Sequence, residues 1–220
     1  MRFPSTLSAL ALAAFSVVPT TNAAQEGSLN ITNPTQVIES AVAEDLAQIV
    51  REINGQDVQV REANGKKGVT FKDGDIPYTM APVFCDIQPG KCLGYVTVVV
   101  VDNSELKFTL DTLNSANRST SFLTFFREEN NKFTVGRVNL VDGGVTKKNI
   151  AINISLCAME FREAMKRLQN QLTVSHDRAT PYQRASYGTA RWRAYAPAPD
   201  YAARMADEFA PEYARRFGRR

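Results

Sequence analysis

The chain has 220 residues, of which 44% are hydrophobic and 22% are charged, and its formal net charge is +3. These values are ordinary for a globular protein, so they exclude a wholly disordered chain and a collagen-like repeat. The single histidine, His176, leaves little room for histidine-rich metal sites or histidine-based catalysis. The length fits one core domain with an extension.

The first 23 residues have the pattern of a secretory signal peptide. Arg2 supplies the positive charge, residues 7–18 form an apolar stretch, and Ala23 completes a small-residue cleavage site. The apolar stretch is too short to anchor the chain in a membrane, and an uncleaved N-terminal helix is the alternative. We therefore expect a periplasmic or secreted protein, cleaved near Ala23, with residues 24–33 as a short lead.

Helix and hairpin patterns alternate through residues 34–175, which we interpret as one domain. A first helix is expected to begin at Asn33, a good N-cap, and Pro34, a residue suited to the first turn, and to end before Gly55. The remaining expected elements are strands at 58–61, 69–72, 76–84 and 93–101, a helix from Ser104 to Asn117, strands at 121–127 and 133–141, and a helix at 146–172. The order α-ββ-ββ-α-ββ-α predicts an α+β domain in which three helices cover an antiparallel sheet of hairpins.

Two cysteines bracket the turn of the second expected hairpin. Pro89 and Gly90 are a strong reverse-turn pair, and a hairpin that turns there places Cys85 and Cys92 opposite each other. Opposed residues on antiparallel strands have Cβ atoms about 4.5–5.5 Å apart, and local twist can bring them within disulfide range. We therefore expect a disulfide between Cys85 and Cys92.

The alternative for these cysteines is half of a zinc site. Such a site would need two more ligands, and Cys157 with His176 does not match known zinc-ligand spacings. No metal or cofactor is therefore expected. Cys157 is left over, and we expect it to be a buried free thiol on a helix, with an intermolecular bridge as the alternative.

The last expected helix begins ambiguously. Isoleucine and leucine alternate with smaller or polar residues over 150–156, which is strand periodicity, whereas the apolar residues after 160 keep helical spacing. We predict a helix throughout. Its apolar residues then cover more than one stripe, so one face should remain for a dimer contact or another protein. The residues predicted for this face are Ile150, Ile152, Ile154, Leu156 and Met159.

Two motifs in this region resemble a known family. Asn114 and Asn117 stand three residues apart at the end of the middle helix, and Gly143-Gly144-Val145-Thr146 leads into the last helix. With the paired cysteines, these motifs resemble exported members of the YbjN family of bacterial proteins over about residues 34–172. The resemblance implies a fold similar to type III secretion chaperones, which commonly form dimers and bind other proteins.

The same motif residues also have structural explanations. Asn117 can close a helix in a left-handed conformation, and Gly143 and Gly144 can supply positive φ between strand and helix. A phosphate-binding loop is the sharper alternative, but its Gly-rich consensus and its Lys-Ser/Thr pair are missing. The family often has tryptophan between the two asparagines, where this chain has Ala116.

Residues 176–220 differ in composition from the rest, with nine arginines, no lysine and five acidic residues. We expect a flexible basic tail, because segments rich in proline and alanine bury little area. The alternative is an amphipathic helix on an anionic membrane surface or polymer. The arginines predicted for that contact are Arg191, Arg193, Arg204, Arg215 and Arg216. A nucleic-acid partner is not expected for an exported protein.

The sequence shows none of the common motifs of catalytic residues that we considered. It has no serine-nucleophile motif and no Cys-His pair, so we do not expect an enzyme. The predicted function is a non-catalytic, exported protein-binding or chaperone-like regulatory module of the bacterial envelope, with an unidentified protein partner or a second copy of itself. An envelope-attachment protein that uses the basic tail is the alternative.

Overall fold

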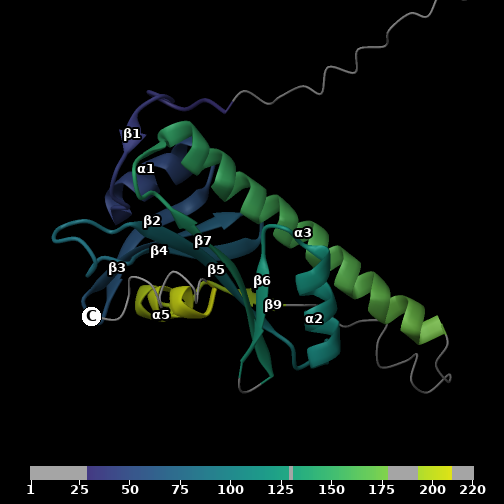
Figure 1. The fold of residues 1–220 in the computed structure, drawn as a ribbon. Helices are drawn as coiled ribbons and strands as arrows, with labels where there is room; N and C mark the ends of the chain where they lie inside the picture. Colours follow the sequence, from purple (N-terminus) through teal and green to yellow (C-terminus); the bar gives the residue numbers. More distant parts are fainter. Residues whose placement is uncertain (1–28, 129–130, 178–192, 210–220) are drawn as a thin grey trace, which may run out of the picture.

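The computed structural model describes residues 29–128, 131–177 and 193–209, with a large antiparallel sheet at the centre (Figure 1). The strands of this sheet are β2 (Gln56–Ala63), β3 (Lys66–Asp73), β4 (Ile76–Val83), β5 (Gly94–Asp102), β6 (Thr124–Arg127), β7 (Lys132–Leu140) and β9 (Arg193–Tyr195). Their order is β2-β3-β4-β5-β7-β6, and β9 pairs with the end of β5. A separate two-stranded sheet joins β1 (Val37–Ile38) to β8 (Val145–Thr146).

Helices cover both faces of the sheet. α1 (Ala43–Glu52), α2 (Leu110–Ser119) and α3 (Lys147–Asp177) lie on one face, which we call the inner face, and α5 (Pro199–Phe209) lies on the opposite, outer face (Figure 1). The predicted α+β class with an antiparallel sheet is therefore confirmed. None of the described helices is long and apolar enough to cross a membrane.

The first helix begins later than predicted. Asn33 has a left-handed φ of 52° and belongs to a turn, and α1 starts after Val42, whose side chain makes no capping hydrogen bond. The intervening chain forms β1, and Ile31 is buried in the core. The start at Asn33-Pro34 is wrong because pairing of β1 with β8 takes this segment into the domain. Of the predicted lead, residues 29–33 are described, and only Ile31 among them is buried.

The first hairpin is tighter than the predicted loop. Ala63 pairs with Lys66, so only Asn64 and Gly65 form the loop. Both residues have positive φ, 49° and 73°, as a two-residue type I′ turn requires.

The predicted disulfide is present in the second hairpin, between Cys85 and Cys92. Gln88 and Lys91 form the bridge that closes the turn. The hairpin also packs against the segment before α1, because Cys92 N–H donates to Ser40 Oγ (2.9 Å) and Lys91 forms an ion pair with Glu39 (2.9 Å). The disulfide therefore fixes a loop that supports the start of α1.

The middle helix also begins later than predicted. Thr109, and not Ser104, is the N-cap, and its Oγ1 accepts the N–H of Thr112. Asn117 lies inside α2 and does not close it in a left-handed conformation. Its Oδ1 instead accepts the N–H of Phe125 (2.6 Å) and its Nδ2 donates to the carbonyl of Phe125 (3.0 Å). Asn117 therefore connects α2 to β6 through the backbone N–H and the backbone carbonyl of Phe125.

Part of the predicted flexible tail is an ordered layer of the fold. We call β9 and α5 the C-terminal strap. β9 pairs with β5 beyond the point where β4 stops pairing, and α5 packs on the outer face of the sheet through buried Ala202, Met205 and Ala206. Residues 178–192 and 210–220, also within the predicted tail, lie outside the described residues. The prediction of a tail outside the domain is therefore wrong for residues 193–209.

Specific contacts seat the strap on the sheet. Thr79 Oγ1 donates to the carbonyl of Pro197, and Asn64 Nδ2 donates to Asp200 (2.8 Å). Gly68 leaves the space that Pro199 occupies, since a Cβ on Gly68 would lie 2.8 Å from Pro199 Cβ. β3 therefore needs glycine at this position for close approach of the strap.

Candidate functional site

The residues predicted for a protein-binding face all lie in α3, but the helix divides them. Ile150 and Ile154 have exposed fractions of 1% and belong to the core. The prediction that these two residues belong to a binding face is therefore wrong. Ile152 and Leu156 are half-buried, and Met159 is 48% exposed. The division follows from helical geometry, because residues two apart lie on different sides of a helix although they share one face of a strand.

The three remaining residues form a continuous surface on α3. Their spacing of four and three residues places Ile152, Leu156 and Met159 on one side of the helix. Lys148 and Glu163 extend the same line by four residues in each direction, and both are exposed. We call these five residues the α3 stripe. It has an apolar centre with a positive charge at its first end and a negative charge at its last.

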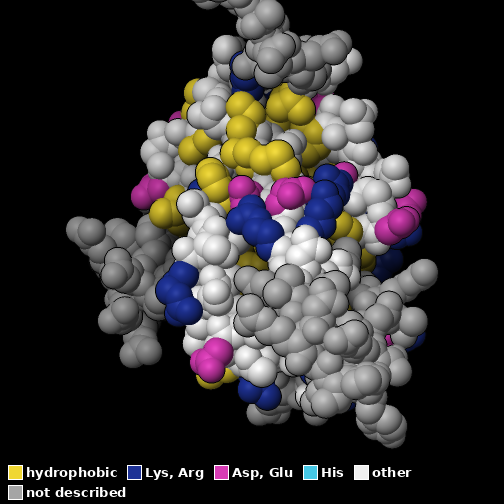
Figure 2. All heavy atoms as spheres, turned by 90° about the vertical axis from the view of Figure 1, so that its right-hand side faces the viewer, with side chains coloured by type: hydrophobic (Ala, Val, Ile, Leu, Met, Phe, Trp, Pro, Cys, Tyr) yellow, Lys and Arg dark blue, Asp and Glu magenta, His cyan; other side chains and the backbone are white. Residues whose placement is uncertain are grey.

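Figure 2 shows this side of the molecule, seen from the right of Figure 1. Hydrophobic side chains gather in its upper part, above a band of acidic and basic side chains. α3 lies on this side of the fold (Figure 1). An apolar patch with a charged border is a common form of protein interaction surface.

The acidic end of the α3 stripe is held in its charged form. Lys166 Nζ lies 2.7 Å from Glu163 Oε1, and this hydrogen bond, together with the charge of Lys166, lowers the pKa of Glu163. Glu163 is therefore ionised at neutral pH. Among the described residues, Lys148 takes part in no ion pair, so its charge remains available at the other end.

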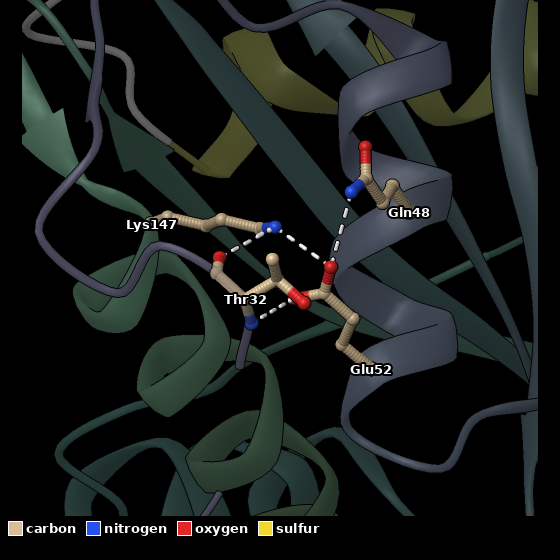
Figure 3. Close-up of polar contacts among 4 residues, drawn as sticks. All are labelled: Thr32, Gln48, Glu52 and Lys147. Carbon is tan, nitrogen blue, oxygen red and sulfur yellow. Dashed lines mark hydrogen bonds and ion pairs between the residues drawn. The ribbon is translucent and has the colours of Figure 1, made fainter. Parts of the chain in front are cut away.

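A buried polar contact fixes the start of α3. Lys147 Nζ donates to Glu52 Oε1 (2.7 Å) and to the carbonyl of Thr32 (2.9 Å), as Figure 3 shows. Glu52 also accepts the N–H of Thr32 (3.1 Å) and the side-chain amide of Gln48 (3.1 Å). The end of α1, the start of α3 and the N-terminal segment are therefore joined at one point, which sets the direction in which the α3 stripe faces.

The arginines predicted for an anionic surface are only partly described. Arg191, Arg215 and Arg216 lie outside the described residues. Arg193 and Arg204 are exposed, Arg193 within 3.7 Å of Glu105 and Arg204 over the ring of Tyr201. The apolar side of α5 faces the sheet, so Met205 is covered by the protein itself. Contact of these arginines with an anionic surface stays a prediction.

The thiol of Cys157 is not in a reactive state. Burial raises the pKa of the Cys157 thiol to about 12, and only the thiolate is a nucleophile, so this side chain is unreactive at neutral pH. Cys157 is the free, buried thiol that the sequence predicts. In the part of the chain that the structure describes, no three His, Cys, Asp or Glu side chains come close enough together to hold a metal ion.

The fold defines a class: an α+β domain with an antiparallel sheet covered by helices on both faces. No protein-family model matches the chain, and no curated protein matches it significantly. A solved structure that is similar is the crystal structure of YbjN from E. coli, described there as a proposed transcription regulator. The two are 12% identical with a TM-score of 0.45, and the match covers 62% of this chain and 96% of that one. This likeness concerns the fold alone.

Proposed function

We propose that the protein is a non-catalytic, exported protein-binding module and that it works as a symmetric pair through the α3 stripe. The observation that supports this most is the apolar centre of α3 that remains after the helix has covered the sheet. A helix on one face of a sheet needs to bury only one side. Ile152, Leu156 and Met159 lie on the other side and stay partly exposed.

The second copy is favoured because the stripe is complementary to itself. In an antiparallel pair with its two-fold axis beside Leu156, Ile152 of one copy faces Met159 of the other. The same register sets Lys148 of one copy against Glu163 of the other, and symmetry repeats both contacts. Opposite charges at the two ends of the stripe therefore oppose the parallel arrangement and favour the antiparallel one.

The size of the surface points to a weak pair. The stripe from Lys148 to Glu163 is about 22 Å long at 1.5 Å per residue. Only three apolar side chains per copy are available, and two of them are half-buried already. Association must also offset at least about 4 kcal/mol of lost freedom. We therefore expect a Kd on the order of 100 µM, which would let other proteins compete for the same face.

Analytical ultracentrifugation over a concentration series tests the pair. We expect Ile152→Asp to give a folded monomer, because it places a carboxylate at the centre of the contact. Lys148→Glu and Glu163→Lys should each weaken association, and the double variant should restore it. Arg118→Glu, a charge reversal on α2 outside the stripe, is the matched control. A natural chain that stays monomeric at several hundred micromolar, or a double variant no better than the single ones, would reject the symmetric pair.

Export is the second part of the proposal. It is supported by the signal-like first 23 residues and by a disulfide, since disulfides persist mainly in oxidising compartments. N-terminal sequencing of the protein from its bacterial host should find Ala24 as the first residue. A chain that keeps Met1 and stays in the cytoplasm would contradict this part without affecting the proposed pair.

A further inference from the structure

A cavity lies where the C-terminal strap crosses the end of the sheet, away from α3. Its volume is about 650 Å³, which is within the range of small-molecule sites in proteins. Its lining residues come from β9, α5 and the segment between them, from the β6–β7 hairpin, and from β5. The residues that line it are Val100, Arg127, Glu128, Lys132, Tyr195, Pro197, Ala198 and Tyr201.

The interior and the rim of this cavity differ in chemistry. Val100, Pro197 and Ala198 contribute apolar surface, and Tyr195 and Tyr201 contribute aromatic rings. The charged groups come from the β6–β7 hairpin and are partly or fully exposed. A ligand that fits would therefore have an apolar or aromatic body and a polar group directed toward the rim.

The acidic group of the cavity already has a partner. Glu128 Oε1 accepts the hydroxyl of Tyr201 (2.6 Å), and the same hydroxyl lies 2.7 Å from Thr134 Oγ1. Burial, followed by the hydrogen bond to Glu128, raises the pKa of Tyr201 to about 12. The hydroxyl therefore stays protonated and continues to donate to Glu128, which orients this carboxylate and uses part of its accepting capacity.

The two cations of the rim are not held in direct ion pairs, although, after hydrogen bonds from Ser104, the charge of Lys132 contributes to the lowered pKa of Asp102, which lies opposite it on β5. Among the described residues, neither Arg127 nor Lys132 takes part in an ion pair. Lys132 Nζ lies 5.6 Å from the centre of the Tyr195 ring, which holds the ammonium beside the cavity. Both side chains are available to donate hydrogen bonds to an anion.

We propose that this cavity binds a small aromatic anion, with the ring between the strap and Val100 and the anionic group against Lys132 and Arg127. Tyrosine and proline surfaces suit a planar ring. Hydrogen bonds from charged donors are stronger than neutral ones. Arg127 and Lys132 outnumber Glu128, the one carboxylate among the described lining residues, so the rim favours a ligand with a negative charge over a neutral or a positive one.

Fluorescence titration of the purified protein with two related dyes tests the site. The probes are 8-anilino-1-naphthalenesulfonate, which is anionic, and N-phenyl-1-naphthylamine, which has the same rings without the sulfonate. We expect saturable binding of the anionic dye at one site per chain. Lys132→Glu or Arg127→Glu should weaken it by about tenfold, while the affinity for the neutral dye changes by less than about twofold.

Two control variants separate this site from other surfaces. Arg61→Glu makes the same charge change on β2, at the far edge of the sheet, and should leave both affinities unchanged. Met159→Lys changes the α3 stripe and should also leave them unchanged. Loss of the anionic dye in Met159→Lys, equal loss of both dyes in the rim variants, or no saturable binding to the natural chain would each overturn the proposal.

Discussion

Lys147 places a positive charge almost out of contact with water, since 5% of its side chain is exposed against 14% for Glu52. A buried charge is tolerated only when it is paired and hydrogen-bonded. Burial acts to raise the pKa of Glu52, but the hydrogen bonds from Lys147, Gln48 and Thr32 outweigh it, so the pKa is lowered. The carboxylate is therefore charged in the folded protein and supports Lys147.

Removal of one partner should cost more stability than removal of both. We expect Glu52→Leu to lower the free energy of unfolding by about 3 kcal/mol, because Lys147 is left buried without its counterion. The double variant Glu52→Leu/Lys147→Met should recover most of this loss. Urea unfolding at pH 7 measures the stability of the natural chain, the single variant and the double variant. A double variant less stable than the single one would contradict the expected desolvation cost.

The same pair predicts a dependence on pH. The pKa of Glu52 is lower in the folded chain than in the unfolded chain. Its contribution to stability is therefore present at neutral pH and is lost as the pH falls below about 4.3, the ordinary glutamate value, and through the lowered one. The difference in unfolding free energy between the natural chain and Glu52→Gln should shrink over that range. A difference that stays constant down to pH 3 would contradict this assignment.

Among the elements, the sequence predicts best where local pattern and tertiary contacts agree. The disulfide hairpin follows from Cys85, Cys92 and a Pro-Gly turn, all of which are local. The Asn33-Pro34 cap fails because β8, more than 100 residues away, pairs with the following segment. A short-range sequence pattern cannot predict a pairing between such distant segments.

The need for a cover such as the C-terminal strap could have been inferred from the sequence of β5. The eight residues from Gly94 to Val101 are all buried, and the run of valines from Val96 onward is visible in the sequence. A strand that is apolar on both sides needs cover on both faces of its sheet, whereas the three predicted helices fit one face. The amphipathic pattern of α5 is visible in the sequence, but no local signal shows that its apolar side covers the sheet and not a membrane or another surface.

The strap should detach without unfolding the rest of the protein. Ala202 is fully buried against the sheet, so Ala202→Asp should remove much of the docking of α5. We expect faster amide hydrogen exchange in residues 193–209, with the inner core still protected. Arg204→Asp introduces the same side chain on the exposed side of α5 and is the control. Global unfolding in Ala202→Asp would instead show that the strap and core form one cooperative unit.

At the scale of the whole molecule, one thiol reports on the integrity of the core. Cys157 is 2% exposed and packs in the cluster that joins α1, α2, α3 and the inner face of the sheet. It is accessible only when this cluster opens. The two remaining cysteines are already joined in the disulfide.

Alkylation without reductant should therefore modify one cysteine at most, and only as fast as the core opens. The free energy of opening derived from the labelling rate of Cys157 should equal the free energy of global unfolding from urea titration. Intact-mass analysis counts the modified thiols. Labelling of the native chain within seconds, or modification of three cysteines, would show that the core or the disulfide is not as described.

The position of the strap in the chain has a consequence for biosynthesis. β9 and α5 are the last described elements, so Val96 and Val98 on the outer face of the sheet have no cover until residues 199–206 have left the ribosome or the translocation channel. Hairpins made early can pair, but the sheet keeps one bare apolar side throughout synthesis. A nascent chain interrupted before residue 199 would then expose the kind of surface by which unfinished proteins are retained and degraded.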